Sequence, residues 1–542
     1  MTLKSSIKKL IQQTIEEQCP QHIKDPKEAA GLLDLKFSVE YPPSSKMGDY
    51  STNLALILSK ELNKRGISIC GNTPEKVAKK FLSFIQGDEK VFKKVEIVKP
   101  GFINFYLTDE FLKGSVKSIL KAKDKFGHVK SNCRSKIQVE FISANPTGPL
   151  TLANGRGGFS GDVLASVLEL AGHKVQREYY VNDYGEQVRK LGHSILKDKE
   201  AQYKGKYIDE LAQELEGEKD VEKLGKRAAD IIVKKYIQPV CEKVGIKFDN
   251  WFLESSLHKK RKVKKLFKEL QKNDLVYKKD GAWWLKTKDS KEDDKDRVLI
   301  KASGDETYFL GDIAYHWNKF AERKFDKVIN LWGADHHGYV GRMQSAMELI
   351  GHGGKLDILL MQLVRLVKDG KEIKMSKRKG VYVLLEELVD EVGLDVARFF
   401  FLMHANNKAM DFDLKLAKEK SQKNPVYYVQ YAHARISSII KKTKGLKKYK
   451  DKDYKLQTAE RELIKELIKW PELIEEVAQS YEVHKIPFYC TALADKFHDF
   501  YEKCKVIEGN KVNSFRLDLI SATSQVLKNS LKCLGVSAPE EM

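Results

Sequence analysis

The sequence predicts a multidomain α/β protein whose middle part is built around a parallel sheet. Its 542 residues exceed the usual size of one domain, which is about 100–200 residues. A strand–loop–helix–strand pattern begins at residue 136, and beyond residue 414 only helical spacing is evident. We therefore expect a small α+β domain at 1–110, a linker helix at 111–135, a parallel-sheet domain at 136–414 and an α-helical domain at 415–542.

The N-terminal region is expected to open with a core helix. Its apolar residues repeat on one helical side: Leu3, Ile7, Leu10, Ile11 and Ile15. The segment carries Glu16 and Glu17 and has no cleavage signature, so it does not resemble a targeting peptide, and we expect a cytoplasmic protein. A further helix is expected at 51–63, and KKVEIVKPGFINFYL predicts two strands around the turn at Pro100-Gly101.

The middle region shows the order of elements that builds a parallel sheet. KIQVEFI predicts a buried strand at 136–142, and SANPTGPLTLANGRGG predicts a loop after it. DVLASVLELAG then predicts a helix and HKVQREYYV a second strand, which together form a βαβ unit of a Rossmann-like sheet. A charged helical insertion is expected at about 195–290. Strands resume in DKVINLWGADHH and DILLMQLVRLV, and KDGK at 368–371 predicts a hairpin.

The C-terminal region is expected to contain helices and no strand. YYVQYAHARISSII, AERELIKELIKWPELIEEVAQSYEV and FRLDLISATSQVLKNSLKCLG all have helical spacing. Between the first two lies a lysine-rich loop at 441–455.

Net charge and cysteine spacing limit the class of protein. Ninety-seven Lys and Arg residues against 76 Asp and Glu residues give +21, which indicates either a polyanionic partner or a lysine-rich soluble surface. Seven dispersed cysteines without a CxxC pair do not form a disulfide framework, so we expect a reducing compartment, no structural zinc and no metal site. No run of about 18 apolar residues is present, so no membrane span is expected.

Two segments could bind phosphate groups. A loop between a strand and a helix directs unpaired backbone N–H groups at a ligand above the sheet, as SANPTGPLTLANGRGG would. The segment matches neither GxGxxG nor GxxxxGK[ST], and a tight turn that needs small residues is the alternative. The run Lys374-Met375-Ser376-Lys377-Arg378-Lys379-Gly380 places four cations near a hydroxyl group, which suits a leaving group such as pyrophosphate. Its alternative interpretation is a solvated basic loop.

Polar residues near predicted strand ends form a third candidate. Glu140 lies in the first strand of the sheet, and His336 and His337 follow the strand VINLW. Tyr308 and Asp312 are four residues apart and share a face if their segment is helical. Carboxylates in a cleft would suit a guanidinium or ammonium substrate. The alternatives are a surface Asp, a core Tyr and histidines bonded within the protein.

Together these segments resemble the class I aminoacyl-tRNA synthetases, and specifically the arginyl-tRNA synthetases of the bacterial type. VEFISANPTGPLTLANGRGG is similar to the family's first signature region, and KMSKRKG contains its second signature motif. EYYVND, DIAYH, GADHHGY, NPVYYVQYAHARI and LGVSAPEEM resemble family segments in the family's order. KMGDYSTNLAL and KPGFINFYL resemble its N-terminal domain, so the resemblance covers nearly the whole chain.

The resemblance implies an ATP-dependent ligase for arginine and tRNA. Arginine and ATP, with Mg²⁺, would give arginyl-adenylate and pyrophosphate, and the arginyl group would then pass to the terminal 2′-hydroxyl of tRNA(Arg) with release of AMP. The implied partners are tRNA(Arg), L-arginine and ATP, and a monomer is expected. The N-terminal domain would contact the tRNA elbow, and the helical C-terminal domain would bind the anticodon.

The resemblance also implies roles for individual residues. Those matching the arginine-binding positions are Glu140, Asn145, Tyr308, Asp312 and His336, with Asp312 expected at the guanidinium. Those expected to act in catalysis are Thr151, Asn154, Lys374, Ser376 and Lys377. Those expected to bind ATP are Ala144, Asn145, Pro146, Thr147, Gly148, Pro149, Thr151, Leu152, Ala153, Asn154, Gly155, Lys374, Met375, Ser376 and Lys377.

The first C-terminal helix carries many polar and aromatic residues. Those expected to stack on or bond to tRNA bases are Tyr427, Tyr428, Gln430, Tyr431 and His433. The alternative is that about half of them pack between helices.

The first signature departs from the family pattern. Where the family has His-x-Gly-His, the chain has Thr151-Leu152-Ala153-Asn154. Asn154 could still donate a neutral hydrogen bond, Thr151 offers a hydroxyl group, and Arg156 could add a cation. A competing hypothesis is therefore a synthetase-like RNA-binding protein that has lost catalysis. The retained KMSK motif and the arginine-pocket residues favour the enzyme, and a nucleotidyl transferase would leave residues 415–542 unexplained.

Overall fold

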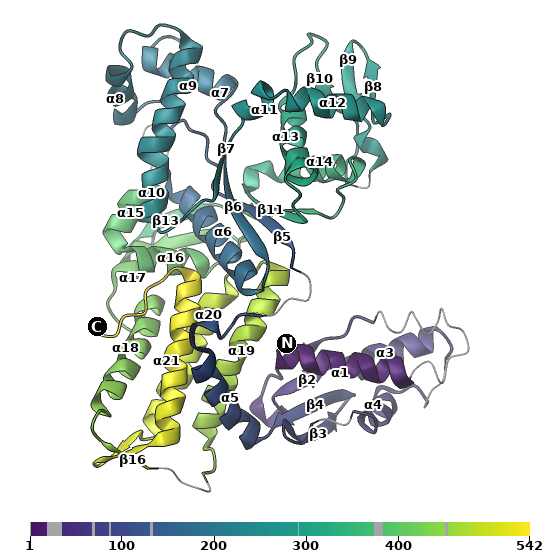
Figure 1. Cartoon of the computed structure of the whole chain (residues 1–542), viewed down its shortest axis with the longest axis vertical. Coiled ribbons are helices and arrows are strands. Elements are labelled where there is room, and N and C mark those ends of the chain that lie inside the picture. Colours follow the sequence, from purple (N-terminus) through teal and green to yellow (C-terminus); the bar gives the residue numbers. More distant parts are fainter. Residues whose placement is uncertain are drawn as a thin grey trace.

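The computed structural model describes residues 2–18, 35–67, 71–85, 88–129, 134–290, 292–372, 383–449 and 454–542. An N-terminal domain extends to one side of an elongated body, which holds the parallel sheet in its middle and a helical bundle at one end (Figure 1). No helix among the described residues combines the length and the apolar character needed to cross a membrane.

The N-terminal domain is a small antiparallel sheet covered by helices. The sheet order is β1-β2-β4-β3, and α1 packs its buried residues Ile7, Ile11 and Ile15 into the domain core. The predicted strand pair is confirmed, since β3 and β4 flank a turn at Lys99–Gly101. The elements are α1 (Leu3–Gln18), β1 (Val39–Glu40), β2 (Tyr50–Thr52), α3 (Leu54–Lys64), α4 (Pro74–Leu82), β3 (Phe92–Val98) and β4 (Phe102–Leu107). Helix α5 (Asp109–Ala122) then leads along the helical bundle, where it packs on α19 and α21.

The central sheet is parallel, as predicted. Its order is β12-β11-β5-β6-β7, so the chain proceeds from β5 to one side through β6 and β7, and to the other side through β11 and β12. In such sheets ligands bind beyond the carboxyl ends of the strands where the order reverses, which here is the end of β5. The strands are β5 (Lys136–Glu140), β6 (Lys174–Val181), β7 (Asn250–Leu253), β11 (Lys327–Gly333) and β12 (Leu356–Met361), and α6 (Leu152–Leu170) connects β5 to β6.

The predicted insertion at about 195–290 is only partly helical. It follows α7 (Glu186–Leu196), and its first half contains α8 (Lys206–Glu214), α9 (Val221–Ile232) and α10 (Gln238–Lys243). The helical prediction is wrong for β7, which returns to the central sheet, and for β8 and β9, which form an antiparallel sheet with β10 beyond the insertion. The remaining elements are α11 (Ser255–Lys259), α12 (Lys262–Lys272), β8 (Val276–Lys279), β9 (Ala282–Leu285) and β10 (Arg297–Ile300).

Two further helices and a hairpin complete the central region. The segment of Tyr308 and Asp312 is helical, which is the condition for their sharing a face, and forms α13 (Tyr308–Trp317); α14 (His337–Leu349) follows β11. The KDGK hairpin is confirmed, because Lys368 of β13 (Val364–Lys368) pairs with Lys371 of β14 (Lys371–Glu372). β15 (Met410–Asp413) runs parallel to β13, and the segment between the hairpin and β15 contains α15 (Leu385–Val392) and α16 (Leu394–Leu402).

The C-terminal region is a helical bundle, but it is not free of strands. After the short α17 (Leu414–Lys418), its helices are α18 (Pro425–Lys442), α19 (Thr458–Ser480), α20 (Lys485–Lys503) and α21 (Ser514–Leu534). A three-stranded sheet of β16 (Lys447–Tyr449), β17 (Ile507–Glu508) and β18 (Lys511–Asn513) shows that the prediction of no strand is wrong. Strands of two or three residues are too short for a period-two pattern to be visible in the sequence.

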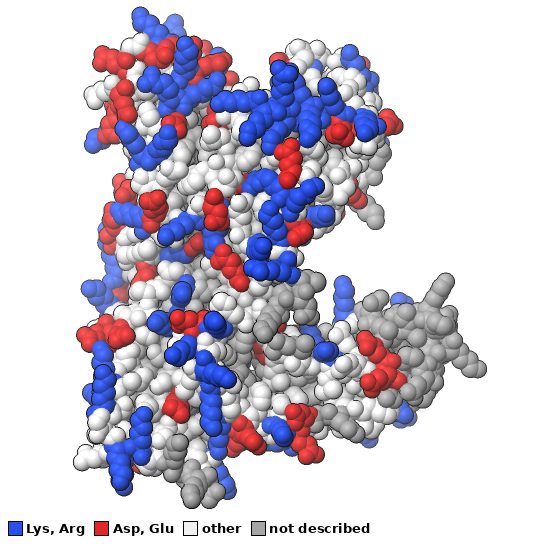
Figure 2. Space-filling view, in the orientation of Figure 1, with Lys and Arg blue, Asp and Glu red and all other residues white. Residues whose placement is uncertain are grey.

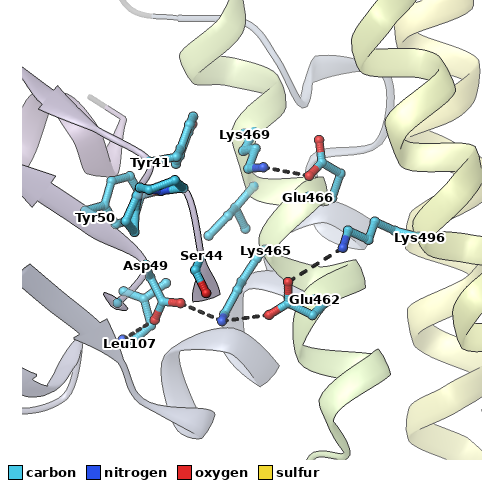
Figure 3. Close-up of a pocket in the computed structure, with 14 residues that line it drawn as sticks. Tyr41, Ser44, Asp49, Tyr50, Leu107, Glu462, Lys465, Glu466, Lys469 and Lys496 are labelled. Atoms are coloured by element: carbon cyan, nitrogen blue, oxygen red, sulfur yellow. Dashed lines mark hydrogen bonds and ion pairs between the residues drawn. The ribbon is translucent and has the colours of Figure 1, made fainter. Parts of the chain in front are cut away.

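Helix α19 attaches the N-terminal domain to the bundle. Its buried Glu472 accepts hydrogen bonds from the hydroxyl of Tyr41, from the hydroxyl of Tyr50 at 3.0 Å and from the Lys4 backbone N–H at 2.9 Å. Beside these bonds Lys465 contacts Asp49 at 2.5 Å (Figure 3). A cavity of about 410 Å³ lies between the two domains at this point.

Replacing Glu472 with Ala should loosen this attachment. The Tyr50 hydroxyl is buried and would lose its acceptor, and one such unsatisfied group costs roughly 1–3 kcal/mol. We expect a lower urea midpoint for Glu472→Ala. The matched control is Glu476→Ala, which removes only a surface ion pair with Lys485, worth about 0–1 kcal/mol. Equal midpoints for the two variants would contradict this role of Glu472.

Candidate active site

The loop after β5 begins the site at the edge of the sheet that the topology indicates. Ile142 and Ser143 both have positive φ, of 64° and 40°, which turn the chain sharply away from the strand. The loop is held from below, since the Tyr179 hydroxyl donates to the Ala144 carbonyl and the Tyr207 hydroxyl donates to the Thr147 carbonyl, both at 2.9 Å. Asn145 is exposed above this support.

The altered signature caps helix α6. Thr151 is the N-cap residue, and its backbone N–H and hydroxyl donate to the Asn154 side-chain oxygen at 2.8 and 3.0 Å. Asn154 therefore uses its carbonyl oxygen within the loop, while its amide nitrogen forms no hydrogen bond with any described residue. A helix N-terminus directs backbone N–H groups and a partial positive charge outward, which suits phosphate oxygens.

The loop also pairs with the segment that follows the second signature. The Leu152 N–H donates to the Val383 carbonyl at 3.0 Å, and the Leu385 N–H donates to the Leu150 carbonyl at 3.0 Å. The expected ATP-binding residues Lys374, Met375, Ser376 and Lys377 lie outside the described residues. The described chain stops at Glu372, the last residue of β14, and resumes at Val383.

Acidic side chains gather at the carboxyl ends of neighbouring strands. Glu140 ends β5 and Glu254 directly follows β7, and both are buried, with 5% and 7% of their surface exposed. Asp183 follows β6 and holds the start of α11, because its two oxygens accept from the Ser255 N–H at 2.8 Å and the Ser255 hydroxyl at 2.7 Å. Asp312 approaches from α13 and accepts a hydrogen bond of 2.5 Å from the Tyr339 hydroxyl.

Asp312 and Glu254 are carboxyl groups whose pKa values are raised above those of ordinary carboxyl groups. Burial raises the pKa of Asp312 to about 6, although its hydrogen bond from Tyr339 opposes the rise. Burial also raises the pKa of Glu254 to about 7, with a contribution from the negative charges of Asp312 and Asp183. No ion pair with either carboxyl occurs among the described residues, so a bound cation would relieve both.

Glu140 differs, because its charge is already compensated inside the protein. The ammonium group of Lys319, which is fully buried, contacts Glu140 directly, and the Tyr315 hydroxyl donates to the same carboxyl oxygen at 3.0 Å. The other carboxyl oxygen has one hydrogen bond among the described residues, from the Ser143 hydroxyl at 3.3 Å. Glu140 can therefore accept a hydrogen bond from a substrate, while Asp312 and Glu254 carry the pocket's uncompensated charge.

The other predicted arginine-binding residues lie at the rim of this pocket. Tyr308 is the first residue of α13 and is 64% exposed. His336 stands at the start of α14 with an exposed side chain, and its ring centroid lies 5.9 Å from that of Trp332. The sequence analysis did not identify Glu254, because the four-residue strand that places it was assigned to a helical insertion.

Arg156 does not supply the cation that the sequence suggested for ATP. Its side chain is 1% exposed and donates to four backbone carbonyls: Gln362 at 2.8 Å, Leu363 at 3.1 Å, Ala405 at 2.8 Å and Lys408. It therefore fixes the first turn of α6 to the backbone just before β13, the strand that leads to the second signature.

The residues expected to bind tRNA bases divide into two groups. Gln430 and His433 are buried and bond to the C-terminal segment, Gln430 to the Ser537 carbonyl at 3.1 Å and His433 to the Pro539 carbonyl at 2.8 Å. The rings of Tyr427, Tyr428 and Tyr431 are partly exposed, although the Tyr428 hydroxyl donates to Asp495 at 2.7 Å. A role in RNA binding stays a prediction for all five.

The central region matches the catalytic domain of the class I aminoacyl-tRNA synthetases, so the chain is a protein of that class. The chain shares its fold with methionyl-tRNA synthetase from Mycobacterium tuberculosis, solved in complex with methionyl-adenylate, with a TM-score of 0.53 and 11% identity over 74% of this chain and 91% of that one. It shares more with the arginyl-tRNA synthetase of Thermus thermophilus, with a TM-score of 0.78 and 20% identity over 100% of both chains.

Sequence comparison places the chain more narrowly. Residues 3–107 match the arginyl-tRNA synthetase N-terminal domain, residues 115–213 and 193–440 match the class I (R) catalytic domain, and residues 429–542 match the DALR anticodon-binding domain. An arginine–tRNA ligase from Listeria welshimeri is 42% identical over 96% of this chain and 98% of its own. The chain belongs to the arginyl-tRNA synthetase family, and its reaction is the attachment of arginine to tRNA through an adenylate. The family implies ATP, arginine and tRNA as its ligands.

Arginine binding should weaken as the pH falls. Because the pKa values of Asp312 and Glu254 are raised to about 6 and about 7, both groups lose charge on acidification from pH 8 to 6, and a neutral carboxyl attracts a guanidinium poorly. We expect the arginine KM to rise several-fold over this range while the ATP KM changes less. Tyr339→Phe removes a bond that lowers the Asp312 pKa, so it should move the rise to higher pH. A flat arginine KM profile would contradict this assignment.

Arg156→Lys should slow adenylate formation without weakening arginine binding. A lysine has a single donor nitrogen and cannot satisfy four carbonyls, so α6 should shift relative to β13. We expect kcat for ATP–pyrophosphate exchange to fall about tenfold, since a loss of about 1.4 kcal/mol of transition-state stabilisation lowers a rate tenfold. Arg398→Lys is the control, because Arg398 is equally buried but bonds to the Leu534 and Val244 carbonyls and to Asp162 instead. A rate loss no larger than that of the control would mean that Arg156 only supports folding.

Proposed function

We propose the following roles for the residues in the family reaction. Asp312 and Glu254 bind the guanidinium group of arginine as a pair, and Tyr308 closes the pocket over it. Glu140 and Asn145 hold the α-ammonium group, and His336 lies beside the pocket entrance. The observation that carries this proposal is that buried Glu254 and half-buried Asp312 form no ion pair among the described residues, since a planar cation offers a bidentate contact to each carboxylate.

ATP would lie on the loop at residues 144–155, with its phosphates toward the N-terminus of α6. The arginine carboxylate oxygen attacks the α-phosphorus, and the bond from that phosphorus to the bridging oxygen breaks as pyrophosphate leaves. Lys374 and Lys377, with Ser376 between them, stabilise the charge that develops on pyrophosphate. Mg²⁺ arrives with ATP and offsets phosphate charge. The terminal 2′-hydroxyl of tRNA then attacks the arginyl carbonyl carbon, and AMP departs.

The location, the oligomeric state, the domain boundaries and the RNA contacts are also proposals. We infer a cytoplasmic monomer, in keeping with Cys241, Cys490, Cys504 and Cys533, which are free and buried. We keep the domain boundaries near residues 110, 136 and 415. The N-terminal domain would contact the tRNA elbow. The partly exposed Tyr427, Tyr428 and Tyr431 of α18 would contact the anticodon.

A charging assay tests the proposed function. Purified protein, ATP, Mg²⁺, tRNA and each of the twenty amino acids should give product only with arginine. Adenylate formation should be measured with tRNA present and absent. The alternative is an RNA-binding protein without catalysis, which would bind tRNA and form neither adenylate nor aminoacyl-tRNA. Two neighbouring carboxyl groups without an ion pair among the described residues have no use in such a protein, and this favours the enzyme.

Asn154 should matter for the first step. Asn154 stands where the family has its second signature histidine, and its amide nitrogen forms no hydrogen bond with any described residue. Loss of one donor to a transition state costs about 2.7–4 kcal/mol, or ~10²–10³ in kcat. Asn154→Ala should slow adenylate formation by about that factor, with little change in the arginine KM. Asn154→His restores a donor but lacks the carbonyl that caps Thr151. If both variants were equally slow, the cap and not the donor would explain the loss.

A further inference from the structure

The cavity between the N-terminal domain and the helical bundle has the size of a small-molecule site. Its volume is about 410 Å³, and such sites measure roughly 300–1,000 Å³. Residues 41–50 supply one wall, and Lys496 of α20 is part of the opposite wall (Figure 3). Four residues of α19, three or four positions apart on one helix face, supply the rest of that wall: Glu462, Lys465, Glu466 and Lys469. None of these residues belongs to the catalytic site.

The cavity is charged but has no net charge. Three acids and three lysines line it. Lys465 contacts Asp49 at 2.5 Å and Glu462 Oε1 at 3.0 Å, and these contacts cross the cavity floor. Lys469 contacts Glu466 at 2.7 Å. Figure 2 shows a large blue area elsewhere, over α11 and α12, so a simple anion would meet more positive surface there than in this cavity. The balanced charge favours a ligand that carries one charge of each sign.

One ion pair in the cavity is loose. Lys496 Nζ lies 3.7 Å from Glu462 Oε2, which is beyond hydrogen-bond distance, and the described residues give Lys496 no other ion pair. The two side chains are 39% and 24% exposed, so a ligand can reach both. The ammonium group therefore keeps donors, and Glu462 Oε2 keeps an acceptor, for a molecule that enters the cavity.

Another part of the lining is apolar. Pro42 and Ile468 are partly buried and Leu107 is fully buried, and all three line the cavity. The other charged groups are already paired at close range, so a charged ligand side chain would gain no partner. An apolar side chain would instead be removed from water against this surface.

We propose that the cavity binds a free α-amino acid with an apolar side chain. The carboxylate of the ligand accepts hydrogen bonds from Lys496 Nζ, and its ammonium group donates to Glu462 Oε2. The 3.7 Å between these two protein groups is close to the distance between the charged groups of an α-amino acid, so the four charges form a ring in which neighbours have opposite sign. The side chain packs on Ile468 and Pro42. Because the walls belong to two domains, the bound ligand strengthens their contact.

Calorimetric titration with L-leucine tests the inference, with saturating arginine present to occupy the catalytic pocket. We expect saturable binding with a dissociation constant of ~1 mM. Two analogues separate the two charges: 4-methylpentanoate lacks the ammonium group, and 3-methylbutylamine lacks the carboxylate. Each should bind about tenfold more weakly, since each has lost one charged hydrogen-bonding group. Equal binding of the three compounds would mean that only the apolar surface is used, and the inference would be wrong.

Variants test the two protein groups. Lys496→Met and Glu462→Gln should each weaken L-leucine binding about tenfold, because each removes one charged partner of the ligand. The matched controls are Lys503→Met and Glu476→Gln, which break ion pairs of α20 and α19 that do not line the cavity. Unchanged arginine binding shows that a variant is folded. Binding of L-leucine by Lys496→Met as tight as by its control, or no saturable binding of any apolar amino acid to the wild-type protein, would overturn the inference. Neither result bears on the proposed function, which uses none of these residues.

Discussion

A buried ionic network beneath the pocket holds the centre of the molecule together. Lys319 lies between the carboxylates of Glu140 and Glu178, and Arg323 pairs with Glu178 from the same turn of helix. Removing these four charges from water is costly unless each has its partner, so the π-helical turn after α13 (Asn318–Glu322), with Lys319 and the following Arg323, is tied to β5 and β6. This attachment positions α13 and therefore Asp312, and it compensates Glu140, whereas Asp312 and Glu254 form no ion pair among the described residues. Under the proposed function, the pocket attracts a cation because Lys319 neutralises Glu140, whereas Asp312 and Glu254 have no cationic partner among the described residues.

The sequence predicted elements best where the local residue pattern alone determines the structure. The run at 136–158 predicted β5 and the first part of the loop after it, because a buried strand that ends in Pro, Asn and Gly residues has few alternative structures. The loop was predicted too long, since residues 152–158 already belong to α6. The spacing of Tyr308 and Asp312 predicted a shared face on the condition of a helix, and α13 meets that condition. Glu254 was missed because β7 has four residues, mostly half-buried, with no alternation to detect. Arg156 was misjudged because its four carbonyl partners are 206–252 residues away, and no local signal reports such contacts.

The altered signature shows how a site can keep its geometry when side chains change. Thr151 and Asn154 form a capping box at the start of α6. Hydroxyl and amide side chains are favoured at a helix start because they bond to backbone groups that the helix leaves unpaired. The start of α6 is preserved in this way, with the Leu152 N–H bonded to the Val383 carbonyl and the Asn154 N–H bonded to the Thr151 carbonyl. The chain has no imidazole at these two positions, so under the proposed function more of the positive charge that opposes the phosphates would come from the helix dipole and from the basic residues at 374–379.

Helix α19 connects the N-terminal domain to the central sheet. It holds the N-terminal domain through Lys465 and Glu472, and its C-cap residue Tyr481 donates to Asp357 of the central sheet at 2.9 Å. From Lys465 to Tyr481 the helix rises about 24 Å, with Pro471 inside it. A proline within a helix removes one backbone hydrogen bond and favours a kink, so the angle at Pro471 sets how the N-terminal domain is oriented toward the sheet. A ligand that contacted both parts would have to match this length and this angle together.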